Sequence, residues 1–294
     1  MWRRVGLVGA WLLATALIVA CARNIEWARA VESLATLSPG WIAAGLLGNS
    51  AILVCWAVFW RSLVPRRAER ASYGRMFEIV STASALMNTL PFGGGHASSV
   101  ALLARRANVT MREALSVLAL DQLGEGLTKV SIFLIVALTA PLPGWMRAGV
   151  TTASVGVAAW FITLLVASRW AQELAILKTW RRAIGAWLCV LAMKGAELAA
   201  IIAVQHAFGV SLSLSGSLLV LAAVVLGTML PLAPGNLGTY EASAFLAYRY
   251  LGLSPAQALS LAIVQHACFF IPAVGFGYAY ISARTLSRSA IASR

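Results

Sequence analysis

Three charged residues near the middle of the chain have a spacing that suits chemistry inside a membrane. Asp121, Glu125 and Lys129 recur every four residues, so an α-helix places them on one face. They interrupt a long apolar run, where a charged side chain is costly unless it is paired or faces water. We expect them to bind a charged group or to relay protons. The alternative is an ion-pair ladder that only holds helices together, and Lys194 with Glu197 is interpreted in that structural way.

A second set of candidates lies at two breaks in apolar segments. The chain reads MNTLPFGGGHASS from Met87 and GTMLPLAPGNLGTYE from Gly227, each time with Leu-Pro and a glycine-rich turn between two short helices. Unpaired backbone at membrane depth is tolerated only where it is buried in protein or lines a wet cavity. The returning helices would point free N–H groups and a positive dipole end at an anion. The substrate-binding residues expected here are Gly93, Gly94, Gly95, His96, Ser98, Ser99, Gly235, Asn236, Gly238, Thr239, Glu241 and His266, with Asn88 as a further polar group.

Several of these residues also have a plain structural interpretation. The alternative for the glycines is that they only permit a tight turn, although the positive field at the helix ends follows either way. Glu241 lies in the first turn of the second returning helix, where a carboxylate is commonly satisfied by backbone amides, and both interpretations stay open. His266 is able to carry a proton, but a single buried histidine is more often simply hydrogen-bonded. His96 is the more favoured ligand-facing histidine.

Composition indicates an all-α membrane protein. The 294 residues are 60% hydrophobic and 11% charged, with a mean hydropathy of +0.82, which is typical of a polytopic helical protein rather than a soluble domain or a β-barrel. The net charge of +13 fits cytoplasmic loops better than nucleic acid, for which no motif is present. No catalytic motif, metal-ligand cluster or cofactor motif is found, so we expect neither an enzyme nor a cofactor. Cys21 follows an apolar run in the manner of a lipoprotein cleavage site, although an uncleaved first helix is favoured.

The apolar segments predict six membrane spans and two re-entrant helical hairpins. The spans are expected at 5–21, 39–60, 114–138, 145–168, 186–207 and 257–281, and the hairpins at about 76–106 and 217–251. Trp41 and Trp60 are expected as interfacial anchors of the second span, and 169–182 as an amphipathic helix in the cytoplasmic interface. With both short pairs as hairpins, nearly all Lys and Arg fall on one side, which places both termini in the cytoplasm.

The two breaks also belong to an internal repeat. Leu90-Pro91 corresponds to Leu230-Pro231, and the small residues that follow each returning helix align as well. The single transmembrane domain, 1–294, then consists of halves of about 1–140 and 141–294. An odd number of crossings separates them, so they are inverted, as in secondary transporters. Chance similarity of such short runs is the alternative.

With these motifs in view, the chain resembles the lysylphosphatidylglycerol synthase transmembrane-region family, also called the flippase-like domain family. The resemblance rests on PLAPGNLGTYE with the following LGLSPAQAL, and on LPFGGG, RRANVT and DQLGE earlier in the chain. It implies a multi-pass protein of the bacterial inner membrane that moves, or helps to move, a lipid. Fused members carry a soluble aminoacyltransferase domain, and since the sequence ends at Arg294 without one, lipid aminoacylation is not expected.

The favoured hypothesis is a flippase that holds an anionic lipid headgroup at the bilayer midplane and works by alternating access. Its partners would be that lipid and the bilayer, with no nucleic acid, and a homo-oligomer remains open. Two alternatives are a proton- or sodium-coupled carrier of a small anion and a non-transporting partner of a lipid-modifying enzyme.

Overall fold

The computed structural model describes residues 37–64, 71–90, 94–167, 180–229 and 233–292. Within these ranges the chain forms helices and short connections, and no β-strand. The helices are α3 (Pro39–Leu63), α4 (Tyr73–Thr89), α5 (Gly94–Arg106), α6 (Met111–Thr139), α7 (Gly144–Ala167), α8 (Trp180–Ala207), α9 (Leu214–Gly227), the 3₁₀ turn η3 (Pro234–Asn236), α10 (Thr239–Tyr250) and α11 (Pro255–Ala292). The all-α fold class is therefore confirmed for the described part of the chain.

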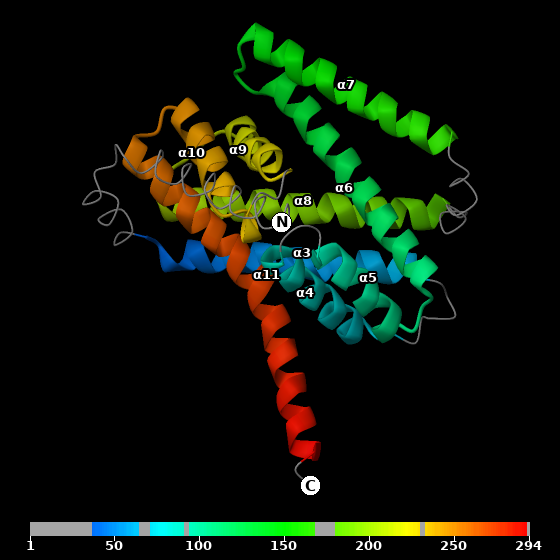
Figure 1. Cartoon of the computed structure of the whole chain (residues 1–294). Helices are drawn as coiled ribbons and strands as arrows, with labels where there is room; N and C mark the ends of the chain where they lie inside the picture. Colours follow the sequence, from blue (N-terminus) through cyan, green and yellow to red (C-terminus); the bar gives the residue numbers. More distant parts are fainter. Residues whose placement is uncertain (1–36, 65–70, 91–93, 168–179, 230–232, 293–294) are drawn as a thin grey trace, which may run out of the picture.

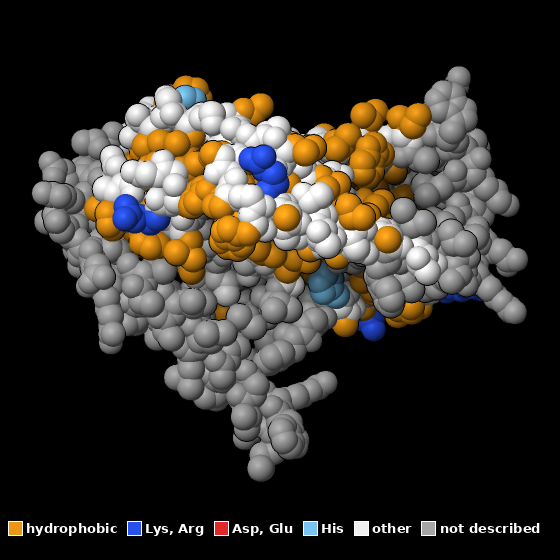
Figure 2. All heavy atoms as spheres, turned by 90° about the horizontal axis from the view of Figure 1, so that it is seen from above, with side chains coloured by type: hydrophobic (Ala, Val, Ile, Leu, Met, Phe, Trp, Pro, Cys, Tyr) orange, Lys and Arg blue, Asp and Glu red, His pale blue; other side chains and the backbone are white. Residues whose placement is uncertain are grey.

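Four of these helices are long and apolar enough to cross a membrane. They are α3, α6, the part of α8 from Ile184, and α11 as far as Ser287. They match four predicted spans, and α7 coincides with a fifth, at 145–168. The predicted span at 5–21, with Cys21, lies outside the described residues, as does the interfacial helix at 169–182 except for 180–182, which begin α8. On the face shown in Figure 2, hydrophobic side chains predominate over a few basic ones, as expected of a multi-pass membrane protein.

An antiparallel pair, α3 and α8, forms the centre of the molecule (Figure 1). Pro39 suits the first turn of α3 because a proline lacks the N–H that would have no partner there. At this end the Ser38 N–H donates to the Ala207 carbonyl over 3.2 Å, and the rings of Trp41 and His206 lie 4.9 Å apart. Along the interface a Cβ atom at Gly48 would lie 3.1 Å from that of Ala200, so the two backbones approach closely.

The two predicted hairpins coincide with two packed pairs of short helices, α4 with α5 and α9 with α10. The first helix of each pair starts at a serine cap, with Ser72 Oγ accepting from the Arg75 N–H and Ser213 Oγ from the Gly216 N–H. At the first tip, a Cβ atom on Gly95 would overlap the backbone of Met87. Only glycine permits so close a return, because it has no side chain. The 14 residues of α9 span only about 21 Å, less than a hydrocarbon core of about 30 Å.

Polar contacts fasten the open ends of the two hairpins at opposite ends of the molecule. Glu78 of α4 accepts from Arg106 of α5 over 2.8 Å and from Arg284 of α11 over 2.7 Å. The Tyr250 hydroxyl, at the end of α10, donates to the Pro141 carbonyl in the loop after α6 over 2.6 Å. The start of α4 and the ends of α5 and α11 therefore meet at one carboxylate, whereas the end of α10 is held to the loop after α6 by a neutral hydroxyl group.

Candidate functional site

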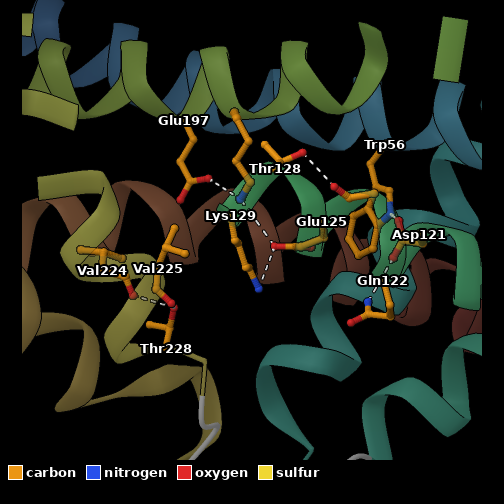
Figure 3. Close-up of polar contacts among 12 residues, drawn as sticks. Trp56, Asp121, Gln122, Glu125, Thr128, Lys129, Glu197, Val224, Val225 and Thr228 are labelled. Carbon is orange, nitrogen blue, oxygen red and sulfur yellow. Dashed lines mark hydrogen bonds and ion pairs between the residues drawn. The ribbon is translucent and has the colours of Figure 1, made fainter. Parts of the chain in front are cut away.

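A cavity of about 270 Å³ lies inside the bundle, between α3, α4, α6, α8, α9, η3, α10 and α11. Its lining includes five acidic or basic side chains, which come from α6 and α8: Asp121, Glu125, Lys129, Lys194 and Glu197. We refer to it as the charged cavity. A polar cavity in a helical membrane protein is a strong indication of a binding site, because charges at that depth are costly to keep. Figure 3 shows the charged groups of α6 and α8 facing one another.

Four of these charges form a continuous chain of ion pairs. Glu125 Oε1 lies 3.3 Å from Lys129 Nζ, one turn along α6, and 3.5 Å from Lys194 Nζ on α8. Lys194 also donates to Glu197 Oε2 over 2.9 Å. The sequence placed Lys129 with Glu125 and Lys194 with Glu197, and the fold joins the two pairs into one. These four ion-paired residues comprise two cations and two anions, so together they are neutral.

Asp121 is the unbalanced charge of the cavity. Its Oδ1 accepts from the indole N–H groups of Trp56 over 2.8 Å and of Trp60 over 3.0 Å, both on α3. Gln122 donates to Oδ2 over 3.3 Å (Figure 3). The carboxyl group is buried and has hydrogen-bond donors, but no ion pair with a described cation. It is therefore suited to hold a proton or to receive a cationic group.

The prediction for Trp60 as an interfacial anchor is wrong. Its side chain is only 1% exposed, and its N–H is used by Asp121 rather than by the membrane interface. Trp56 and Trp60 are spaced by four residues, so they share one face of α3. That spacing was the signal available in the sequence, but it does not reveal that the face points at Asp121.

Two asparagines bring the helix breaks to the cavity. Asn236, in the 3₁₀ turn, lines it with a positive φ of 55°, and its buried Oδ1 has no hydrogen-bond partner in the described structure. Asn88, near the end of α4, also lines the cavity and donates to the Ser84 carbonyl over 2.9 Å. Each hairpin tip therefore contributes an amide group. At the second tip Gly235 adopts a φ of 64°, and a Cβ atom there would overlap the ring of Phe270.

Glu241 and His266 lie beside the second tip but do not line the charged cavity. Glu241 Oε2 accepts from the Gly238 N–H over 2.7 Å, which satisfies the start of α10. Its Oε1 lies 2.8 Å from His266 Nδ1, while His266 Nε2 lies 2.9 Å from the Gly235 carbonyl. A carbonyl only accepts, so Nε2 carries a proton, and one further proton is shared between Nδ1 and the carboxyl group. The pair fixes the turn between η3 and α10.

A neutral network continues from this turn into the bundle. Tyr240 stacks on His266 with ring centroids 4.2 Å apart, and its hydroxyl accepts from Gln265 over 3.0 Å. Gln265 in turn accepts from Tyr248 over 2.6 Å, and Tyr248 accepts from Gln205 over 3.4 Å. Every member is buried and partnered, which is typical of a network that fixes one packing arrangement. Tyr240 also lines the charged cavity, so this network positions one of its walls.

The other described residues predicted at the breaks do not line the cavity. Gly93 lies outside the described residues. Gly94 and Ser98 are half-buried, Gly95 and Ser99 are buried within the hairpin, and His96 is exposed. Ser99 Oγ donates back to the Gly95 carbonyl, and Thr239 Oγ1 donates to the Asn236 carbonyl. Gly238 supplies its N–H to Glu241. Among the described residues, no group of three or more His, Cys, Asp or Glu could hold a metal ion.

Comparison with known proteins gives one match. A family model described as the lysylphosphatidylglycerol synthase TM region matches residues 5–277. No curated protein and no solved structure matches the chain.

Proposed function

Since the chain belongs to the lysylphosphatidylglycerol synthase transmembrane-region family, whose members are membrane proteins linked to lipid handling, we propose that it is a lipid flippase. The substrate would be an anionic phospholipid of the bacterial inner membrane. The observation that carries this proposal is the charged cavity, which offers both cations and anions to one ligand. Phospholipid headgroups always carry a phosphate and often an amine, and both have partners here.

In this proposal the phosphate is bound by the two lysines. Lys129 has Glu125 as its ion-pair partner, and its side chain is 26% exposed, so its ammonium group is accessible to a ligand. Lys194 lies deeper, between Glu125 and Glu197. A phosphate oxygen that replaced Glu125 as the partner of either lysine would keep that lysine paired and would release Glu125 from it. Asp121, with Glu125 once it is released, would receive an amine where the headgroup has one.

In this proposal the two lysines bind the anion, rather than the helix N-termini that the sequence suggested. At the start of α10 the Gly238 N–H already has the carboxylate of Glu241 as its acceptor. This end of the helix is therefore neutralised by a residue of its own first turn. At the first tip, Ser99 Oγ donates to the Gly95 carbonyl, and His96 is exposed and does not line the cavity. Asn88 and Asn236 are the groups of the tips that would contact a headgroup.

The packing of the helices supports two inverted halves that work by alternating access. The helix α4 of the first half packs on α11 of the second, and the equivalent α9 of the second half packs on α6 of the first. The equivalent helices α3 and α8 pack on each other at the centre. Such a pattern is expected of two repeats related by a pseudo-twofold axis, with a site at their interface. The charged cavity lies between helices of both halves.

The test is headgroup translocation in proteoliposomes. Labelled phosphatidylglycerol, phosphatidylethanolamine and phosphatidylcholine would be compared for wild-type protein, Lys129→Gln and the control Arg105→Gln, which changes an exposed cation outside the cavity. We expect about tenfold slower translocation for Lys129→Gln, the equivalent of one lost charge-assisted hydrogen bond, and wild-type rates for the control. No translocation of any of the three lipids by folded wild-type protein would refute the proposal.

The same cavity volume would also admit a phosphate-sized anion, so the small-anion carrier is the second candidate. Uptake of radiolabelled phosphate or glycerol phosphate into the same vesicles separates the two functions. A carrier would accumulate the soluble anion and leave the lipid label in place.

A further inference from the structure

A second pocket lies beside the charged cavity, and its lining is apolar. It has a volume of about 120 Å³ and is formed by side chains of α3, α6 and α8, among them Phe59, Leu123, Leu127 and Val190. We refer to it as the chain groove. An apolar cavity of about 150 Å³ binds the six-carbon ring of benzene, so a groove of about 120 Å³ corresponds to a few methylene groups of a hydrocarbon chain.

The chain groove and the charged cavity lie at the same depth along α6. The charged face of this helix carries Asp121 and Glu125, and the groove face carries Leu120 and Gly124, each one position earlier. Successive residues on a helix are rotated by about 100°, so the two faces are adjacent and level. A ligand bound to the charges would therefore need no shift along the helix to reach the groove.

A single side chain, Val190 of α8, belongs to the lining of both spaces. It is buried, and it packs on Gly124, where a Cβ atom would lie 3.3 Å from its Cγ2 and 3.7 Å from the ring of Phe59. Val190 and the Gly124 on which it packs therefore lie where the two spaces meet.

We propose that the chain groove holds one acyl chain of the lipid whose headgroup occupies the charged cavity, and that Val190 is the partition between chain and headgroup. This inference rests on the proposed function. A flipped lipid must keep its chains in hydrocarbon while its headgroup crosses a polar site, and the structure places an apolar and a charged space on either side of one residue. Because the two spaces share Val190 in their linings, an acyl chain in the groove would lie directly beside the bound headgroup, unlike the lipid that surrounds any membrane helix.

The first test fills the groove. Leu123→Trp adds bulk inside it, and Leu138→Trp makes the same change on the same helix at a side chain that is 78% exposed and outside the groove. We expect phosphatidylglycerol translocation to fall about tenfold in Leu123→Trp, because the loss of room for one or two methylene groups has about this effect. Leu138→Trp should keep the wild-type rate. Equal rates in the two variants would overturn the proposal.

The second test measures lipid contact with the groove by photocrosslinking, in protein whose groove residues are unchanged. Phosphatidylglycerol with a photoactivatable group in the middle of one chain would be crosslinked in vesicles, and the labelled peptides mapped. We expect labelling at Leu123, Leu127 and Trp187 to fall about tenfold in Lys129→Gln, which weakens the hold on the headgroup, while labelling at Leu138 stays constant. Groove labelling that is unchanged in Lys129→Gln would contradict the proposal that the groove holds an acyl chain of the bound lipid.

The two proposals fail in different ways. Groove labelling that depends on Lys129 without any translocation would show a bound lipid that is not moved, and would refute only the flippase function. Translocation that depends on Lys129, with uniform labelling along α6, would refute only the chain groove.

Discussion

Glu125 of α6 and Lys194 of α8 form an ion pair across the charged cavity, with 3.5 Å between Oε1 and Nζ. In the proposed repeat, α6 belongs to the first half and α8 to the second, so this pair joins the two halves through groups that also line the site. A phosphate that competes with Glu125 for Lys194 would change the contact between the halves as it binds. Substrate binding and a shift between conformations would then be coupled at one pair.

The first prediction separates the binding role of Lys194 from a purely structural one. Lys194→Met leaves Glu125 and Glu197 without their shared cation, so we expect a loss of stability of about 3 kcal/mol and little transport. The double variant Lys194→Met with Glu197→Gln removes one charge of each sign and should recover most of the stability. Its translocation rate should remain about tenfold or more below wild type, because the phosphate partner is missing.

Thermal unfolding in detergent and the vesicle assay measure the two effects for Lys194. If the double variant regains both stability and transport, the role of Lys194 is to stabilise helix packing and not to bind phosphate.

The second prediction uses the two indole donors to Asp121. An asparagine still offers an oxygen to Trp56 and Trp60, so Asp121→Asn should keep the melting temperature while it removes the unbalanced charge. Asp121→Ala leaves both N–H groups without their acceptor and should cost about 1–3 kcal/mol for each. We expect Asp121→Asn to slow transport of an amine-containing lipid more than that of phosphatidylglycerol. Equal slowing of both lipids would contradict a direct contact between Asp121 and the amine.

The third prediction concerns Glu241 and reverses the emphasis that its place in the sequence suggested. A glutamine can accept from the Gly238 N–H through its oxygen and donate to His266 Nδ1 through its nitrogen. Glu241→Gln should therefore fold and transport at close to the wild-type rate, whereas Glu241→Ala should lose about 1–3 kcal/mol of stability. The vesicle assay is applied to both variants. Loss of transport in a stable Glu241→Gln protein would show that the Glu241 carboxylate has a direct role in transport.

The sequence predicted the helical elements well, because each relies on local signals. Apolar length predicted α3, α6, α8 and α11, and the Leu-Pro-Gly breaks predicted that one short helix ends before each break and another begins after it. The i,i+4 spacing predicted that Asp121, Glu125 and Lys129 share a face, and that face does line the cavity. The relative positions of these three residues depend only on the geometry of the one helix that carries them.

Contacts between distant segments were beyond the sequence. Trp60 is 61 residues from its partner Asp121, and nothing near it distinguishes a buried donor from an interfacial anchor. Likewise, the ion pair of Lys194 with Glu125 depends on how α8 crosses α6, although each residue could be paired locally. The exposed His96 shows the same limit, since the direction of a side chain at a tight turn depends on the packing of both helices.

The last prediction tests whether α4 and α5 form a re-entrant hairpin or one broken span. In the structure Glu78 of α4 accepts from Arg106 of α5 and from Arg284 of α11, so the start of α4, the end of α5 and the end of α11 lie at one end of the bundle. With the positive-inside rule, this basic end is expected in the cytoplasm.

In a variant without native cysteines, single cysteines at Tyr73, Arg105 and Arg249 would be labelled with an impermeant maleimide in oriented vesicles. A hairpin requires Tyr73 and Arg105 to react from the same, cytoplasmic side and Arg249 from the opposite one. Reaction of Tyr73 and Arg105 from opposite sides would mean that the first pair crosses the membrane, which would also remove the inverted relationship of the two halves.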